Sequence, residues 1–405
     1  MARRFGGWRS ACARCSRLRA MTLPPLSLYL HLPWCVRKCP YCDFNSHTLG
    51  AEDQTDRYVQ ALCSDLQLEA AAGRAAGRTI DTVFFGGGTP SLFSPGQIAA
   101  LLEAIGALLT VSPRAEITME ANPGTIEHGR LADYSLAGIN RLSLGAQSFD
   151  PDMLERLGRI HAPGDIIAAC DEASQAGFAA INLDLMFALP GQDLSLAAAD
   201  LEQALACQPA HISYYQLTLE PNTVFHSRPP DDLPDDDAAW QMQEQGHAML
   251  AAAGFSQYEV SAFASGGQQC RHNLNYWQFG DYLAIGAGAH GKFTATDGSI
   301  WRYRKPAHPA AYMQQSQAGS FKEEPERVAP AALCFEYMLN ALRLPAGFVE
   351  QDFVARTGLP FSVLEQPLRR AETAGMIEAT AAARWRPTAL GLRFLNDLQA
   401  QFLPH

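Results

Sequence analysis

The chain has 405 residues and a formal net charge of −11, with 47% hydrophobic and 18% charged residues. This is the balance of a globular protein, and the acidic surplus argues against nucleic acid as a partner, because a nucleic-acid binder carries a basic stripe. Ten cysteines are too few for a disulfide scaffold and predict a reducing, cytoplasmic location. No uncharged apolar run approaches the roughly 20 residues of a membrane span. Peripheral contact with a membrane surface stays open.

Residues 1–25 are expected to form a disordered basic extension. Residues 1–20 contain six arginines and no acid, a composition compatible with a transit peptide, and Met21 offers a second start. Cys12 and Cys15 form a C-x2-C pair, but no second pair lies nearby, so we assign no metal site to them.

From residue 26 to residue 228, strand-like and helix-like segments alternate. The predicted strands cover residues 27–32, 82–86, 116–121, 141–146, 180–187 and 211–219. The helical patterns between them cover residues 55–72, 95–109, 127–137, 164–176 and 196–206. Near-continuous apolar strands predict an α/β fold whose parallel sheet is covered on both faces. Functional residues are expected in the loops that follow the strands, as at the mouth of a barrel.

The rest of the chain divides into two further predicted parts. Residues 229–326 are expected to flank the barrel, with a helix at 238–253, a strand at 257–263 and an aromatic-rich stretch at 270–290. Residues 327–405 are expected to form a C-terminal winged-helix-like domain, because a helix is followed there by a hairpin-like segment.

Three cysteines, Cys35, Cys39 and Cys42, form a C-x3-C-x2-C pattern just after the first predicted strand. Three thiolates within eight residues can hold one [4Fe-4S] cluster, and three ligands for four irons leave one iron open for chemistry. Two alternatives remain at this point. One is a zinc site completed by His31 or His47, and the other is a set of free buried cysteines.

The cysteine spacing, with the aromatic Tyr41 before the third cysteine, resembles the radical S-adenosylmethionine superfamily. In that superfamily the open iron binds the amino and carboxylate groups of S-adenosylmethionine, and an electron from the reduced cluster releases a 5′-deoxyadenosyl radical. The resemblance implies a partial (β/α)6 TIM-like barrel whose open side admits a large substrate. It also implies a protein that supplies the electron.

Polar residues recur at the ends of successive predicted strands. The Gly-Gly-Gly-Thr-Pro run at 86–90 would let backbone amides approach a ligand, and Asp184 lies inside an apolar run where a carboxylate needs a partner. A local ion pair or a turn would also explain each of these polar residues taken singly. Their repeated occurrence at the ends of successive strands is what favours a shared pocket. The resemblance implies that S-adenosylmethionine is bound by Tyr29, Tyr41, Gly87, Gly88, Thr89, Glu120, Gln147, Arg159 and Asp184.

In this order the motifs resemble the oxygen-independent coproporphyrinogen dehydrogenase family and its haem chaperone branch, from about residue 26 to the C-terminus. Phe44 stands where the dehydrogenase pattern has a further cysteine, which favours the chaperone branch. Residues 272–277 match the H-N-x-x-Y-W motif associated with haem in that branch. His272 is therefore assigned to haem, with Tyr276 and Trp277 able to stack on the porphyrin. The alternative is a histidine satisfied among core aromatics.

The expected function is a haem chaperone that holds a [4Fe-4S] cluster, S-adenosylmethionine and haem, and delivers haem to acceptor proteins. No catalytic residue is assigned. The alternative is a radical enzyme that oxidatively decarboxylates porphyrinogen propionates. A third, weaker hypothesis is a winged-helix regulator that senses through its cluster. It needs a basic recognition helix, and Arg369 and Arg370 lie close to the acidic residues Glu365, Glu372 and Glu378.

Overall fold

The computed structural model describes residues 23–50, 54–125, 130–322, 324–380 and 383–404. Residues 1–22, with Cys12, Cys15 and Met21, lie outside the described part of the chain, so the disorder expected for that extension stays a prediction. None of the described helices is long and apolar enough to cross a membrane.

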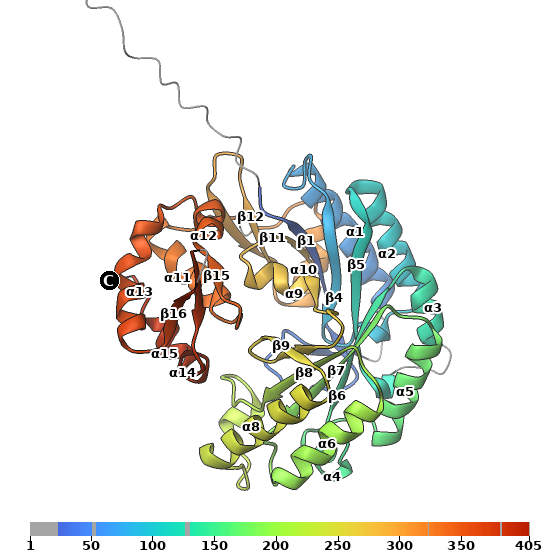
Figure 1. Ribbon diagram of the computed structural model, residues 1–405. Coiled ribbons are helices and arrows are strands. Elements are labelled where there is room, and N and C mark those ends of the chain that lie inside the picture. Colours follow the sequence, from blue (N-terminus) through green and yellow to red (C-terminus); the bar gives the residue numbers. More distant parts are fainter. Residues whose placement is uncertain (1–22, 51–53, 126–129, 323, 381–382, 405) are drawn as a thin grey trace, which may run out of the picture.

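Within the described residues, seven parallel strands form the centre of a twelve-stranded sheet (Figure 1). In spatial order they are β11 (Asp281–Ile285), β1 (Leu26–Leu32), β4 (Ile80–Gly87), β5 (Val111–Ala121), β6 (Arg141–Gln147), β7 (Ala180–Phe187) and β8 (His211–Gln216). The six strands predicted up to residue 219 are all present. The seventh, β11, lies beside β1 although some 250 residues separate them in the chain.

The helices between these strands follow the curved outer face of the sheet (Figure 1). They are α1 (Thr55–Ala71), α2 (Pro95–Leu108), α3 (Arg130–Ala137), α5 (Pro163–Gln175) and α6 (Leu194–Ala206). A short helix, α4 (Pro151–Arg156), and the 3-10 turns η1 (Pro90–Leu92) and η2 (Pro123–Thr125) were not predicted. The helix expected at 127–137 begins at Arg130 among the described residues.

The parallel strands bury one apolar face, whereas two apolar faces were expected from the sequence. In β7, Leu183 and Leu185 are fully buried in the same core as Ala197 and Leu201 of α6. Asp184, which lies between these leucines, faces the opposite side and lines a cavity. The strands therefore alternate between apolar and polar residues, because consecutive side chains of a strand point to opposite faces. The polar set lines the inside of the barrel.

Antiparallel strands extend the sheet at both edges. β10 (Ala262–Ala264) and β9 (Ser256–Glu259) follow β8, and on the other side β12 (His290–Thr294), β13 (Ile300–Arg304) and β14 (Glu326–Arg327) follow β11. The remaining elements of this part are α7 (Val224–Ser227), α8 (Asp236–Ala252), α9 (Arg271–Trp277) and α10 (Pro309–Gln317). The region expected to flank the barrel thus contributes strands to the same sheet.

A smaller C-terminal unit contains the antiparallel sheet β15-β17-β16. Its elements are α11 (Pro330–Ala341), β15 (Phe348–Val349), α12 (Glu350–Thr357), η3 (Phe361–Leu364), α13 (Glu365–Thr373), β16 (Ile377–Thr380), β17 (Arg384–Pro387), α14 (Ala389–Arg393) and α15 (Leu395–Ala400). Its core includes Tyr337, Phe353 and Leu368 and also takes in Phe279 and Ile300 from the preceding region. Helices with a small antiparallel sheet agree with the predicted winged-helix-like domain.

Candidate functional site

A cavity of about 1790 Å³, including its solvent-open mouth, lies at the carboxyl ends of the parallel strands. Loops at this end of a barrel bring together residues that are far apart in the sequence, so a ligand site is expected there. Of the residues predicted to hold a cofactor, all but Tyr29 and His272 line this cavity. They are Cys35, Cys39, Tyr41, Cys42, Gly87, Gly88, Thr89, Glu120, Gln147, Arg159 and Asp184.

The three cysteines lie on one loop that begins at β2 (Trp34–Cys35), which pairs with β3 (His47–Thr48). Each sulfur has a polar neighbour. The Thr89 hydroxyl lies 3.5 Å from Cys35 Sγ, Arg159 Nη1 lies 3.8 Å from Cys39 Sγ, and Ser46 Oγ lies 3.8 Å from Cys42 Sγ. A hydrogen bond donated to sulfur favours the thiolate, the form that binds iron, whereas burial raises the pKa of the Cys35 and Cys42 thiols. The loop therefore presents three thiols, supported by donors, to one cavity.

The zinc alternative is not supported by the histidines around this loop. His31 Nε2 lies 3.0 Å from the Asn45 carbonyl and its Nδ1 lies 3.0 Å from the Tyr29 hydroxyl. His47 Nε2 lies 3.2 Å from Asn45 Oδ1. Across the described residues no three His, Cys, Asp or Glu side chains converge as the ligands of one metal ion would. Cluster thiols need not converge so tightly, because each binds a different iron.

The glycine loop after β4 is shaped by its packing against the cysteine loop. Gly87 has φ +118°, and a Cβ there would lie 2.6 Å from the His31 ring. A Cβ at Gly88 would lie 2.6 Å from the Trp34 carbonyl oxygen. Both positions therefore need glycine even without a ligand, and a valine at Gly87 would disturb the loop before it met a cofactor.

Two buried carboxylic acids face the cavity from β5 and β7. Burial, and after it the neighbouring Asp184, raise the pKa of Glu120 to about 7, while the Gly87 N–H, which donates to Glu120 Oε2 at 3.0 Å, opposes this shift. Burial also raises the pKa of Asp184, whose carboxylate accepts from Asn182 at 2.8 Å and Ser143 at 3.1 Å. A cationic group in this part of the cavity would be stabilised by both acids.

Arg159 and Gln147 retain unused hydrogen-bonding atoms at the cavity wall. Arg159 Nη2 donates to the Gly145 carbonyl at 2.8 Å, but its Nε has no partner among the described residues. Gln147 Oε1 is also buried without a partner there, and Gln147 has φ 63°, a strained conformation for a residue other than glycine. Unpaired buried polar atoms cost free energy unless a ligand satisfies them, so these two residues fit a polar ligand.

Tyr29 and His272 lie beneath the cavity and do not line it. The two rings are 6.4 Å apart, and the His272 ring stacks on Phe84 at 4.9 Å. His272 Nδ1 lies 2.8 Å from the Thr82 hydroxyl and Nε2 lies 3.3 Å from the Tyr276 hydroxyl. Burial lowers the pKa of His272 to about 3. To bind a haem iron through one ring nitrogen, His272 would have to give up the hydrogen-bond partner of that nitrogen.

Some residues of the cavity wall were missed by the sequence reasoning. Asn273 lines the cavity from α9, beside Trp277, which was expected to contact a porphyrin, and Arg343 reaches the cavity from the C-terminal unit. The Arg343 Nε donates to Glu259 at 2.7 Å, and its guanidinium lies 4.6 Å from the Trp277 ring centre. Helical spacing puts positions 273 and 277 on one face of the helix and positions 272 and 276 on another. This spacing could have predicted from the sequence that the two pairs face different surroundings. No local pattern marks Arg343.

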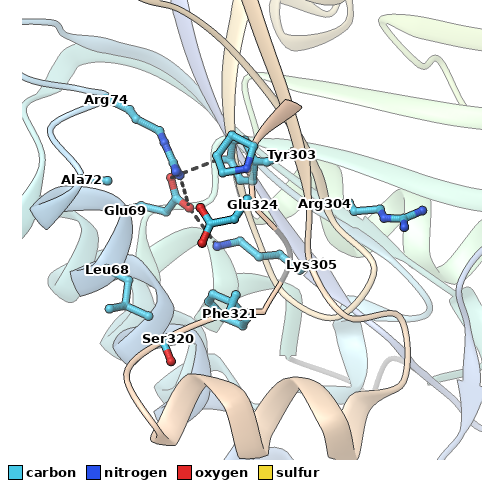
Figure 2. A pocket seen from close by; sticks show the side chains of 11 residues that line it. Leu68, Glu69, Ala72, Arg74, Tyr303, Arg304, Lys305, Ser320, Phe321 and Glu324 are labelled. Carbon is cyan, nitrogen blue, oxygen red and sulfur yellow. Dashed lines mark hydrogen bonds and ion pairs between the residues drawn. The ribbon is translucent and has the colours of Figure 1, made fainter. Parts of the chain in front are cut away.

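A second hollow, of about 510 Å³, lies between α1 and β13 (Figure 2). Glu69 accepts hydrogen bonds there from Arg74 at 2.8 Å, Lys305 at 2.8 Å and the Tyr303 hydroxyl at 3.1 Å. These charges neutralise one another, and none of the predicted cofactor residues lines the hollow. We interpret it as a buried ion-pair cluster that ties α1 to β13.

The parallel barrel, the three-cysteine loop after its first strand and the polar cavity at its mouth define a radical SAM protein. A sequence model of the Radical SAM superfamily matches residues 29–202. The heme chaperone HemW of Escherichia coli (strain K12) is 51% identical over 381 residues, covering 94% of this chain and 99% of its own. HemW of Haemophilus influenzae is 48% identical over 383 residues, covering 94% and 98%. The chain therefore belongs to the radical SAM superfamily and, within it, to the HemW family.

A solved structure shares the fold. Coproporphyrinogen III oxidase (HemN) from Escherichia coli, described as a radical SAM enzyme, superposes with a TM-score of 0.79 over 94% of this chain and 90% of its own. The sequence identity is 22%, so this likeness concerns the fold alone. The family and the fold class predicted from the sequence are both confirmed.

Proposed function

We propose that this chain is a haem chaperone that holds a [4Fe-4S] cluster and S-adenosylmethionine, binds haem and delivers it to acceptor proteins. The observation that carries the proposal is the 51% identity, over almost the whole of both chains, to a protein named as a heme chaperone. The cavity adds support, because its cysteines, acids and arginine match the chemical groups of the two cofactors.

In this proposal Cys35, Cys39 and Cys42 bind the cluster. When bound, the cluster supplies one-electron chemistry to S-adenosylmethionine at the open iron. Arg159, with its unused Nε, pairs with the methionyl carboxylate, and Glu120 accepts a hydrogen bond from the methionyl amino group.

The remaining predicted residues have supporting roles in this proposal. Gln147 and Asp184 accept hydrogen bonds from the ribose, and the amides of Gly87, Gly88 and Thr89 approach the methionyl group. Tyr41, whose ring lies 6.5 Å from Phe225, packs beside the cluster. Tyr29 lies beneath Glu120 and would support it, so its direct contact with the cofactor stays a prediction. The assignment of His272 to haem also stays a prediction, and its two buried partners favour a structural role instead.

One residue in the cavity wall favours the chaperone over the decarboxylating enzyme. Phe44 is 57% exposed and lines the cavity beside Cys42, at the position where the dehydrogenase pattern carries a further cysteine. A phenyl ring offers neither a thiol nor an acid to a reaction at the open iron. It leaves an apolar surface at the cavity mouth.

The test uses the full chain, purified and reconstituted without oxygen. It is loaded with haem and mixed with a haem-free acceptor, and haem transfer is followed by absorbance. A parallel sample receives a reductant, S-adenosylmethionine and coproporphyrinogen. We expect haem transfer and no decarboxylation. Production of protoporphyrinogen without haem transfer would establish the enzyme alternative instead.

A further inference from the structure

A third cavity lies between α9 and the C-terminal unit. Its volume is about 660 Å³ including its solvent-open mouth, and Trp277 lines both this cavity and the central one. Trp277 is the last residue of the H-N-x-x-Y-W motif, so this motif reaches the third cavity through its tryptophan.

The walls of this cavity are aromatic on several sides. Tyr337 and Phe348 line it together with Trp277, and the Tyr337 and Phe348 rings meet edge to face with centres 5.7 Å apart. Tyr337 is 2% exposed, and its hydroxyl has no hydrogen bond to any other described residue. Flat aromatic walls with one available hydroxyl suit a planar ligand that needs a polar contact.

The charge at the rim of this cavity is positive and partly unpaired. Arg356 is half-buried and makes no hydrogen bond or ion pair with the described residues, and Asp352 is the acid that lines the cavity with it. Arg384 donates from Nη1 to the Ala346 carbonyl at 3.0 Å. The charged hollow of Figure 2 differs, because Arg74 and Lys305 are paired there with Glu69. Two guanidinium groups against one acid favour an anionic ligand.

We propose that haem binds in this inter-domain cavity, with its ring against Trp277, Tyr337 and Phe348 and its propionates paired with Arg356 and Arg384. The proposal rests on the proposed function, since it takes from it that the chain binds haem. It places haem outside the cavity of the cysteines, with Trp277 as the shared wall. Haem and S-adenosylmethionine can then be held at the same time.

The test is haem titration of the reconstituted full chain, with Arg356→Ala beside the matched control Arg386→Ala. Arg386 belongs to the same unit, is 52% exposed at its side chain and pairs with Glu378 away from the cavity. We expect Arg356→Ala to weaken haem binding by about tenfold or more, because a charged hydrogen bond is lost. Arg386→Ala should bind as the wild type does. Cluster absorbance should be the same in all three proteins.

A second variant keeps the test decisive if Arg356→Ala folds poorly. Gln278 is an exposed residue of the same wall, and Gln278→Glu should weaken haem binding by placing a negative charge beside the propionates. If both variants bind as the wild type does while Arg343→Ala weakens binding, haem lies in the central cavity and this proposal is overturned, although the proposed function stands. If the wild type binds no haem, the proposed haem site and the proposed function are both refuted.

Discussion

At the scale of single residues, Glu120 is the group in the central cavity that changes charge near neutral pH. Burial raises its pKa to about 7, so at pH 7 it exists in both forms. A bound amino group that donates a hydrogen bond to Glu120 would favour its carboxylate form, lower this pKa and release a proton. The affinity for S-adenosylmethionine should therefore depend on pH.

We predict that S-adenosylmethionine binds more tightly at pH 8 than at pH 6, with a change of up to about tenfold per pH unit below the pKa of Glu120. Glu120→Gln should bind more weakly and lose most of this dependence, whereas Glu103→Gln on the exposed side of α2 should keep it. Titration calorimetry at both pH values, in buffers with different ionisation enthalpies, measures affinity and proton release. A Glu120→Gln protein with the wild-type pH dependence would remove Glu120 from this role.

At the same scale, locality decided which residues of the cavity wall could be predicted from the sequence. The cysteines and the glycine loop were found because their chemistry is contained in a few consecutive residues. Arg343 was not found, because its position at the cavity depends on its pairing with Glu259, 84 residues earlier. The strain at Gln147, φ 63°, was equally invisible in the sequence.

At the scale of elements, α9 shows how one short motif divides its roles between two faces. His272 and Tyr276 hydrogen-bond to each other and face β4, where His272 meets Thr82. Asn273 and Trp277 face the central cavity. The sequence singled out the motif, but only the packing of α9 determines which of its residues line a cavity. In this structure the histidine holds the helix against the sheet.

We therefore predict that His272→Ala lowers the free energy of unfolding by about 1–3 kcal/mol, because Thr82 and Tyr276 lose a buried partner. Thermal or urea unfolding measures this loss. Haem affinity and cluster absorbance should stay close to wild type in the folded variant. If haem affinity fell sharply while stability did not change, the sequence-based assignment of His272 to haem would be supported and its structural role refuted.

At the scale of the whole molecule, the sheet joins the barrel to the regions that follow it. Alternating strand and helix patterns predicted β1 and β4 to β8, because each βα unit is local. The pairing of β1 with β11 joins Leu28 to Leu283, and no sequence pattern specifies a partner so distant. The same long-range packing creates the inter-domain cavity. Its lining comes from α9 and the C-terminal unit, which were predicted separately.

The central claim is that three thiols at the barrel mouth hold an iron–sulfur cluster. The most direct measurement is iron content and visible charge-transfer absorbance after anaerobic reconstitution, for the wild type, for Cys35→Ala, Cys39→Ala and Cys42→Ala, and for the control Cys334→Ala. Cys334 is a half-buried thiol of α11 that does not line the cavity. We expect about four irons per chain in the wild type and the control, and loss of the cluster in the others. Wild-type iron content in a variant lacking all three cysteines would contradict the account.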